Sequence, residues 1–251
     1  MRTATPRRSR LPEAVLTGAS LHDHASPRQQ HHFDTMAQQK EAATLGMWVF
    51  LVTEIMFFGG MFAAYMVYRM WYFQGFAAAS EELDITLGGI NTVVLIGSSL
   101  TVALAVHAAQ EGRKTQTVAL LIATGVLGLT FLVIKYFEYK VKIVGHHLPD
   151  GTMITLFPAA GFFDVSQSEH LAPIASQVRI FMVLYFALTG MHALHMIIGI
   201  GILAVILRMA IKGAFTKEWH VPVELFGLYW HFVDIVWIFL FPLLYLVHRH
   251  G

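Results

Sequence analysis

The sequence predicts an all-α, polytopic membrane protein with five transmembrane helices in a bundle, and three observations lead to this fold class. Of its 251 residues, 56% are hydrophobic and only 13% are charged, whereas soluble domains carry roughly a quarter charged residues. A water-soluble globule of this length has too little interior to hide so much apolar surface. The apolar residues also gather in five separate stretches, each near the ~20 residues that a membrane-spanning helix needs.

The expected spans occur in the order 45–72, 86–109, 116–138, 178–208 and 224–247. Residues 1–44 are polar and basic and lack an apolar run long enough for a signal-peptide core, so we expect a partly flexible cytoplasmic segment there. Small residues are frequent within the spans, which suits close packing between helices in lipid. The connection 140–177 is too long for a simple turn and is expected on the outer side.

Lysine and arginine are distributed unequally over the two sides of the predicted bundle. The side with the N-terminus and the segments near 110–115 and 208–223 carries 11 of them, and the other side carries 5. The positive-inside rule therefore places the N-terminus in the cytoplasm and the C-terminus outside.

Composition also excludes several classes of function. The chain contains no cysteine, which excludes disulfide scaffolds, cysteine-ligated zinc, iron–sulfur clusters and thiolate-ligated haem. A formal net charge of +1 gives no indication of nucleic-acid binding. The sequence has no glycine-rich phosphate-binding loop, so it shows no binding site for ATP-driven chemistry.

Glu54 is the main candidate functional residue in the first span, because a charge in lipid is costly. It lies about 14 Å into the span, close to mid-depth, at a rise of about 1.5 Å per residue. Desolvation at that depth favours the neutral carboxyl group. Two interpretations remain open: a protonatable group that faces a partner or cavity, and a neutral acid that hydrogen-bonds across helices. Its helical face carries no group able to neutralise a carboxylate, since it holds Met47, Phe50, Phe58 and Met61.

Two polar pairs occur at i, i+3 spacing in the last two spans: His192 with His195, and His231 with Asp234. The histidine pair supplies too few ligands for a metal or haem site, and the Glu-x-x-His spacing of a di-iron bundle is absent from the sequence. We expect Asp234 and His231 to pair with each other and to fix helix packing. A stand-alone membrane enzyme with a His192/His195 metal site is one alternative.

The remaining polar candidates are expected to contact other helices, lipids or subunits. Lys135 and Glu138 are expected to form an ion pair at the outer end of the third span, with the lysine snorkelling toward the surface. His107 lies near the inner end of the second span, within reach of lipid headgroups. Structural or lipid contacts are also expected of Arg208 and Trp230. Interhelical hydrogen bonds are expected from a polar stripe on the second span: Asn91, Thr92, Ser98, Ser99 and Thr101.

Five segments, taken in order, resemble subunit III of the haem–copper terminal oxidases, the cytochrome c oxidase polypeptide III type in its five-span form. The match covers about residues 42–248. Each segment is a weak signal alone, and the five together are highly specific. They are LGMWVFLVTEIMFFGGMF in span one, the polar stripe Asn91–Thr101 in span two, FEY at Phe137–Tyr139, TGMHALHMIIG at Thr189–Gly199, and YWHFVDIVW at Tyr229–Trp237.

The resemblance implies a non-redox core subunit of a respiratory oxidase in a bacterial cytoplasmic (inner) membrane. It implies that the chain carries neither haem nor copper, packs directly against subunit I, and joins further oxidase subunits, including subunit II. It also implies bound phospholipid and support of proton uptake during oxygen reduction by the haem- and copper-containing partner. The membrane carboxylate for which the family is known matches Glu54, and this glutamate together with YWHFVD looks more like cytochrome c oxidases than quinol oxidases.

The sequence departs from the family pattern in two ways. Many family members have seven spans, and this chain lacks the first two, which puts the lipid cleft between the two-helix and five-helix bundles in question. The connection 140–177 is also longer than the family pattern suggests. The alternatives are an accessory subunit of a quinol oxidase or of a nitric-oxide reductase system, and a proton-coupled membrane transporter that uses Glu54 and Asp234 as proton carriers.

Overall fold

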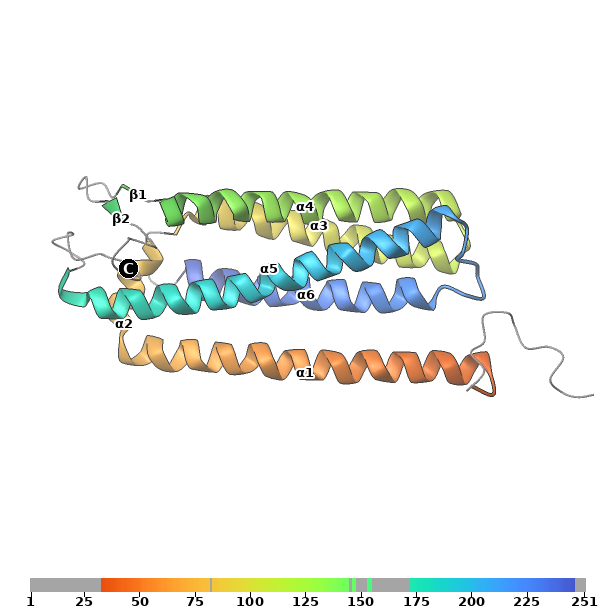
Figure 1. Ribbon diagram of the computed structural model, residues 1–251, viewed down its shortest axis with the longest axis horizontal. Helices are drawn as coiled ribbons and strands as arrows, with labels where there is room; N and C mark the ends of the chain where they lie inside the picture. The colour runs from red at the N-terminus through yellow and green to blue at the C-terminus, as the bar shows by residue number, and fades with distance from the viewer. Residues whose placement is uncertain (1–32, 82, 145, 148–152, 155–171, 247–251) are drawn as a thin grey trace, which may run out of the picture. The chain divides into compact units, whose positions relative to one another are not determined.

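The computed structural model describes residues 33–81, 83–144, 146–147, 153–154 and 172–246. Its α-helices are α1 (Met36–Trp71), α2 (Phe73–Glu81), α3 (Ile85–Gln110), α4 (Lys114–Val144), α5 (Ala175–Ile211) and α6 (Val221–Tyr245) (Figure 1). A 3-10 turn at Ala172–Ile174 precedes α5, and the two-residue strands β1 (His146–His147) and β2 (Met153–Ile154) pair antiparallel.

The predicted fold class and the five membrane-spanning helices are confirmed. Helices α1, α3, α4, α5 and α6 are long and apolar enough to cross a membrane. Even α6, with 25 residues, is about 38 Å long, which exceeds the hydrocarbon core of about 30 Å. Most of the connection 140–177 and the expected tail up to residue 32 lie outside the described residues, although α4 continues to Val144 and α5 begins at Ala175.

Local sequence signals set the helix ends. The Asp84 carboxylate caps α3 by accepting a hydrogen bond from the Thr86 backbone N–H at 2.8 Å. Gly112 follows α3 with a φ of 74°, and Gly213 follows α5 with a φ of 73°. Glycine adopts this left-handed conformation at little cost, so both positions allow the chain to reverse sharply into the next helix.

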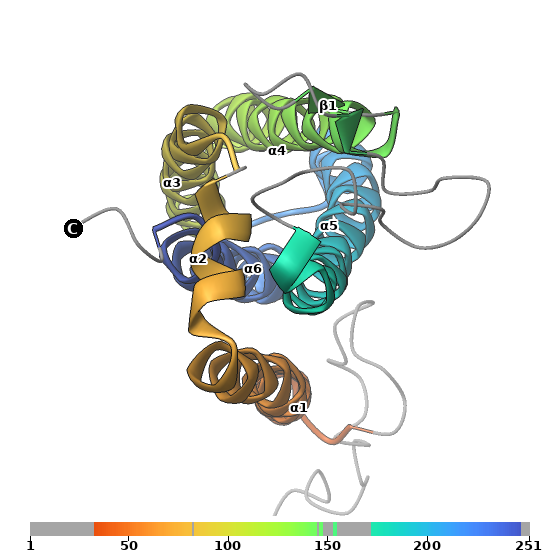
Figure 2. The ribbon, with the colours of Figure 1, turned by 90° about the vertical axis from the view of Figure 1, so that its left-hand side faces the viewer.

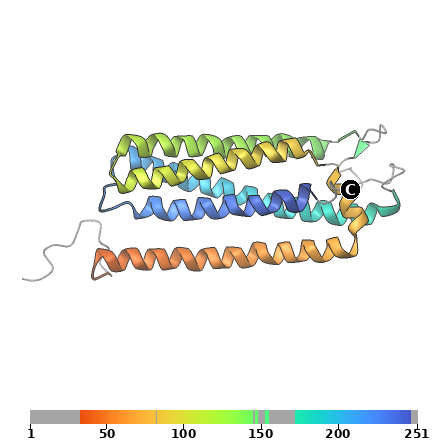
Figure 3. The same ribbon diagram turned by 180° about the vertical axis from the view of Figure 1, so that it is seen from behind.

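Four helices form the packed centre of the protein. The chain divides after Ala43 into two compact units, and the second unit, Thr44–Gly251, holds every contact described below. Within this unit α3, α4, α5 and α6 lie side by side in that order, and α6 closes the ring against α3 (Figure 2). The view from behind shows α3 and α6 running along each other (Figure 3). Helix α2 packs mainly on α5.

Helix α1 touches this bundle along one narrow seam. Its buried residues are Leu51, Phe58 and Tyr65, seven positions apart, so they repeat on one helical face. The Tyr65 hydroxyl donates a hydrogen bond to the Leu243 backbone carbonyl at 2.8 Å, near the end of α6. Much of the α1 surface away from this seam stays exposed, including Val52 and Met56.

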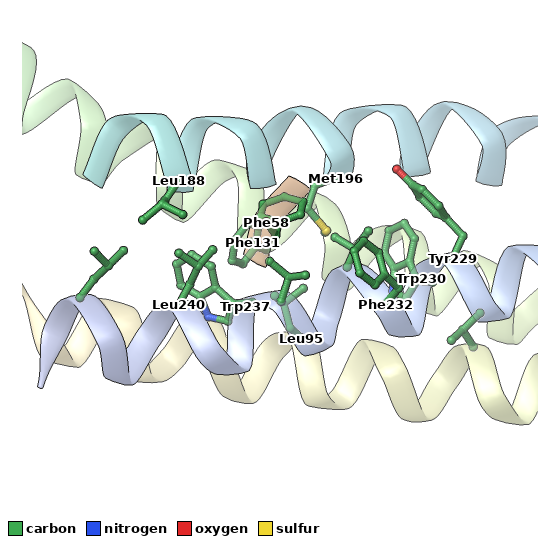
Figure 4. Packing of buried hydrophobic residues seen from close by; sticks show 14 of the residues in the cluster. Phe58, Leu95, Phe131, Leu188, Met196, Tyr229, Trp230, Phe232, Trp237 and Leu240 are labelled. Atoms are coloured by element: carbon green, nitrogen blue, oxygen red, sulfur yellow. The ribbon is translucent and has the colours of Figure 1, made fainter. Parts of the chain in front are cut away.

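Trp230 of α6 fills the middle of the bundle (Figure 4). A Cβ atom added at Gly128 of α4 would lie 2.9 Å from the Trp230 ring, and one added at Gly199 of α5 would lie 3.0 Å from it. The indole Nε1–H donates to the Ser98 Oγ of α3 at 2.8 Å. Two glycines and one serine therefore let a single indole join α3, α4, α5 and α6.

Candidate functional site

The membrane carboxylate of α1 meets a histidine of α5. Glu54 Oε2 lies 3.0 Å from His195 Nε2. His195 Nδ1 lies 2.8 Å from the Met191 backbone carbonyl, one turn earlier. The Tyr229 hydroxyl of α6 donates to the His195 carbonyl at 2.8 Å. The sequence had shown no partner for Glu54 on its own helix, and the structure supplies one from a residue 141 positions away.

The hydrogen bonds of His195 limit where protons can sit. A backbone carbonyl only accepts, so Nδ1 carries a hydrogen and donates it to Met191. The contact between Nε2 and Glu54 then requires one further proton: either a protonated Glu54 donates to a neutral imidazole, or an imidazolium donates to a carboxylate. The pair is electrically neutral overall in both forms, which suits its position inside an apolar helix bundle.

The pair lies at an apolar groove of about 560 Å³ between α1, α5 and α6. The side chain of Glu54 is 19% exposed and that of His195 is 10% exposed. The groove is otherwise lined almost wholly by apolar side chains, among them Met47, Phe50, Ile198, Ile202 and Phe226. At this groove Glu54 Oε2 is paired with His195 Nε2, and the rest of the lining offers mainly apolar contacts.

Glu54 should be the carboxyl group most reactive toward a hydrophobic carbodiimide, which attacks protonated acids from the membrane phase. Glu54 opens on the groove, whereas Asp234 and Glu138 are 2% and 4% exposed. Peptide mapping by mass spectrometry after brief treatment of membranes should find most of the adduct on Glu54. Glu54→Gln, which keeps size and hydrogen bonding, should remove that adduct. A dominant adduct on Asp234 or Glu138 would contradict this assignment.

His192 has a different environment from His195. It is fully buried between Phe131 of α4 and Trp237 of α6, with ring centroids 5.3 Å and 5.2 Å away. Neither ring nitrogen has a hydrogen-bond partner within the part of the chain that the structure describes. The two histidines therefore contact different neighbours. The described residues contain no group of three or more side chains that could hold a metal ion.

The expected pairing of Asp234 with His231 is wrong. His231 Nδ1 lies 2.6 Å from the Ser99 hydroxyl of α3. Asp234 is buried, and neither of its carboxylate oxygens has a hydrogen-bond partner among the described residues. Residues three apart on a helix can each turn toward a neighbouring helix, and here α3 supplies the partner of the imidazole.

The polar stripe of α3 makes hydrogen bonds to two other helices. Besides the bonds of Ser98 and Ser99 to α6, the Trp237 Nε1–H donates to the Thr92 hydroxyl at 3.1 Å. Thr101 Oγ1 lies 2.8 Å from Thr124 Oγ1 of α4. Asn91 is fully buried, and its amide has no hydrogen-bond partner among the described residues.

Lys135 does not snorkel as expected, because it is 3% exposed and points into the bundle. Its Nζ donates to Glu138 Oε2 at 2.9 Å and to the Tyr245 hydroxyl at 2.7 Å. Glu138 Oε1 accepts from the hydroxyls of Tyr185 and Tyr245 at 2.8 and 2.6 Å. The ammonium group also lies 4.6 Å from the centre of the Trp237 ring, within cation–π range. A buried charged cluster therefore ties together α4, α5 and α6.

The tyrosines of this cluster were not identified from the sequence. Tyr185 and Tyr245 lie 47 and 107 positions from Glu138, so neither spacing nor periodicity links them to it. The available signal was the i, i+3 pair of opposite charges inside an apolar stretch. If the two charges had been interpreted as a buried pair rather than a surface pair, further hydrogen-bond partners from other helices would have been expected.

The two candidates at the predicted inner end of the bundle lie at the protein surface. His107 Nε2 is 3.6 Å from Glu111 Oε1, and its side chain is 66% exposed. Glu111 in turn pairs with Arg113 at 2.8 Å. Arg208 is exposed in the last turn of α5. Neither His107 nor Arg208 contacts Glu54, and neither lines the groove beside Glu54.

Comparison with known proteins identifies the family of the chain. The family model described as cytochrome c oxidase subunit III matches residues 22–166 and 143–248. Cytochrome c oxidase subunit 3 of Synechocystis is 31% identical over 80% of this chain and 74% of its own length. The subunit of the same name from Thermostichus vulcanus is 30% identical over 86% of this chain and 92% of its own length, and that from Formosania lacustris is 31% identical over 86% and 73%. The chain therefore belongs to the cytochrome c oxidase subunit III family and is a subunit of a haem–copper oxidase.

Proposed function

We propose that this chain stabilises the haem- and copper-containing subunit I of a bacterial cytochrome c oxidase, supports its proton uptake, and binds phospholipid beside Glu54. Electrons pass through the partner subunits, which carry the cofactors, and this chain carries none. The observation that carries the proposal is the Glu54–His195 pair, a single-proton site at the edge of an apolar groove in a chain of this family. The names of the relatives support cytochrome c, rather than quinol, as the electron donor.

The other polar groups support a role without redox chemistry in this chain. Hydrogen bonds between helices occupy Ser98, Ser99 and Glu138, so these residues hold the bundle together. His195 is bonded to Glu54 and to Met191, which leaves neither ring nitrogen for a metal ion. The groove beside the pair offers apolar contacts from Met47 and Phe50 of α1 and from Ile198 and Ile202 of α5, as an acyl chain requires.

The proposal includes an inside N-terminus and an outside C-terminus in the cytoplasmic membrane, from the unequal distribution of lysine and arginine. An amine-reactive, membrane-impermeant label added to right-side-out vesicles should modify Lys140, which is exposed near the end of α4. It should spare Lys212 and Lys217, which are exposed in the turn between α5 and α6 at the opposite end. Permeabilised vesicles, in which all three lysines should react, provide the control. Preferential labelling of Lys212 and Lys217 in intact vesicles means that the topology is inverted.

Deleting this chain tests the functional proposal. The haem-loaded partner should still reduce oxygen at first, with slower proton uptake, and should lose activity several-fold sooner during continuous turnover. Oxygen consumption followed over successive turnovers, with proton uptake measured alongside, gives both quantities. Complete loss of oxygen reduction in an assembled, haem-loaded partner would show instead that this chain takes part in the chemistry.

A further inference from the structure

Three polar side chains inside the helix bundle have no hydrogen-bond partner among the residues that the structure describes. They are Asn91 of α3, His192 of α5 and Asp234 of α6, which are 0%, 0% and 2% exposed. Both polar atoms of each side chain are buried and unpaired, which makes six such atoms. In protein interiors nearly every buried polar atom bonds to protein or to ordered water, because an unpaired one is costly.

All three side chains belong to the surroundings of one buried indole, that of Trp237 in the packed core (Figure 4). The centre of the His192 ring lies 5.2 Å from the centre of the Trp237 ring. Thr92, which follows Asn91 on α3, accepts a hydrogen bond from the Trp237 Nε1–H at 3.1 Å. Asp234 precedes Trp237 by three residues, which is about one turn of the same helix. Three helices therefore bring unpaired polar groups to one layer of the bundle.

The chemistry of this layer favours water over an ion. Two other polar groups at the same indole are bonded elsewhere: the Thr92 hydroxyl donates to a carbonyl of its own helix, and Lys135 donates to Glu138. The Asn91 amide and a neutral His192 each need a donor and an acceptor, which neither a cation nor an anion supplies by itself. Water donates and accepts, and it also donates to a carboxyl oxygen such as those of Asp234.

We propose that the layer around Trp237 is an internal hydration site, in which ordered water molecules bind to Asn91, His192 and Asp234. Buried waters in proteins typically make about three hydrogen bonds to polar groups that have no other partner, and this layer offers six such atoms. The bound waters join α3, α5 and α6 where direct hydrogen bonds between these side chains do not. The inference rests on the fold and goes beyond the proposed function, which does not require it.

X-ray radiolysis of the intact complex tests the site in the unaltered chain, because hydroxyl radicals formed from a bound water oxidise the side chains beside it. Phe131 and Phe181 form a matched pair, since both are 0% exposed. The Phe131 ring lies 5.3 Å from His192, whereas the Phe181 ring lies 5.3 Å from that of Phe76. Peptide mapping by mass spectrometry should find Phe131 and Trp237 oxidised several-fold faster than Phe181. Equal protection of all three rings overturns the proposal.

Asn91→Leu gives a second, independent readout, because leucine has a similar volume and makes no hydrogen bond. If water pairs the amide, the variant loses those bonds and should unfold at a lower temperature. If the amide is unpaired in a dry core, removing it should raise the unfolding temperature, and that result overturns the proposal. Thr130→Val is the control, since Thr130 is exposed and its hydroxyl bonds only to the Val126 carbonyl of its own helix. Co-purification of the haem-containing partner reports separately on the proposed function.

Discussion

Glu138→Leu is expected to destabilise the helix bundle by about 3–5 kcal/mol, the usual effect of removing one partner of a buried ion pair. The Lys135 ammonium group would keep the Tyr245 hydroxyl and the Trp237 ring but would lose its counter-charge. Both hydroxyls that donate to Glu138 would lose their acceptor as well. Thermal unfolding of the purified protein in detergent, monitored by helical circular dichroism, measures the change.

The double variant Lys135→Met, Glu138→Leu is the matched control. It removes the unpaired charge together with its partner, and replacing a whole buried pair by apolar residues is often close to neutral. The double variant should therefore be more stable than Glu138→Leu alone. If Glu138→Leu unfolds at the temperature of the parent protein, or if the double variant is the less stable of the two, the cluster is not a buried ion pair.

Trp230→Ala is expected to cost about 3–5 kcal/mol of unfolding free energy, the range for removing a large aromatic side chain from a packed core. The cost should be high in this range because Gly128 and Gly199 have no side chains to fill the space left by the indole. Trp230→Phe should cost less, since it retains a ring and loses mainly the hydrogen bond to Ser98, worth about 1 kcal/mol.

Ile197→Ala is the control for Trp230→Ala, because Ile197 is 56% exposed on α5 and is not part of the buried core. Its effect on the unfolding free energy should stay within about 0.5 kcal/mol. Unfolding in mixed detergent micelles, with the denaturing fraction varied, ranks the three variants. Equal destabilisation by Trp230→Ala and Ile197→Ala would show that the indole does not join the four helices.

Hydropathy predicted the number and order of the membrane helices. It suffices for this because a helix in lipid makes all its backbone hydrogen bonds within itself, so each span can be recognised without knowing its neighbours. The order of the five sequence motifs indicated the protein family. Neither signal specifies which side of a helix faces another helix. The predicted ion pair of Lys135 with Glu138 was therefore right, and the predicted snorkelling was wrong. The same spacing fits a surface pair and a buried pair, and the decisive partners, Tyr185 and Tyr245, come from α5 and α6.

The same limit explains the outcome for the other site residues. Glu54 was recognised as a carboxylate in need of a partner, but only the packing of α1 on α5 shows that the partner is His195. Asp234 and His231 are neighbours on one helix, so sequence favoured a pair, whereas Ser99 of α3 lies closer to the imidazole. Contacts within a helix follow from residue spacing. Contacts between helices depend on how each helix is rotated about its axis and how deep it lies in the membrane, and these cannot be read from a single sequence.

Whether this chain is a cofactor-free subunit of a haem–copper oxidase can be decided from the optical spectrum of the complex purified through an affinity tag on it. We expect haem absorbance and copper in the intact complex, together with a larger subunit that retains both after this chain is dissociated as a colourless polypeptide. Purification of the chain without any haem-containing partner, or retention of stoichiometric haem or copper by the isolated chain, would contradict it.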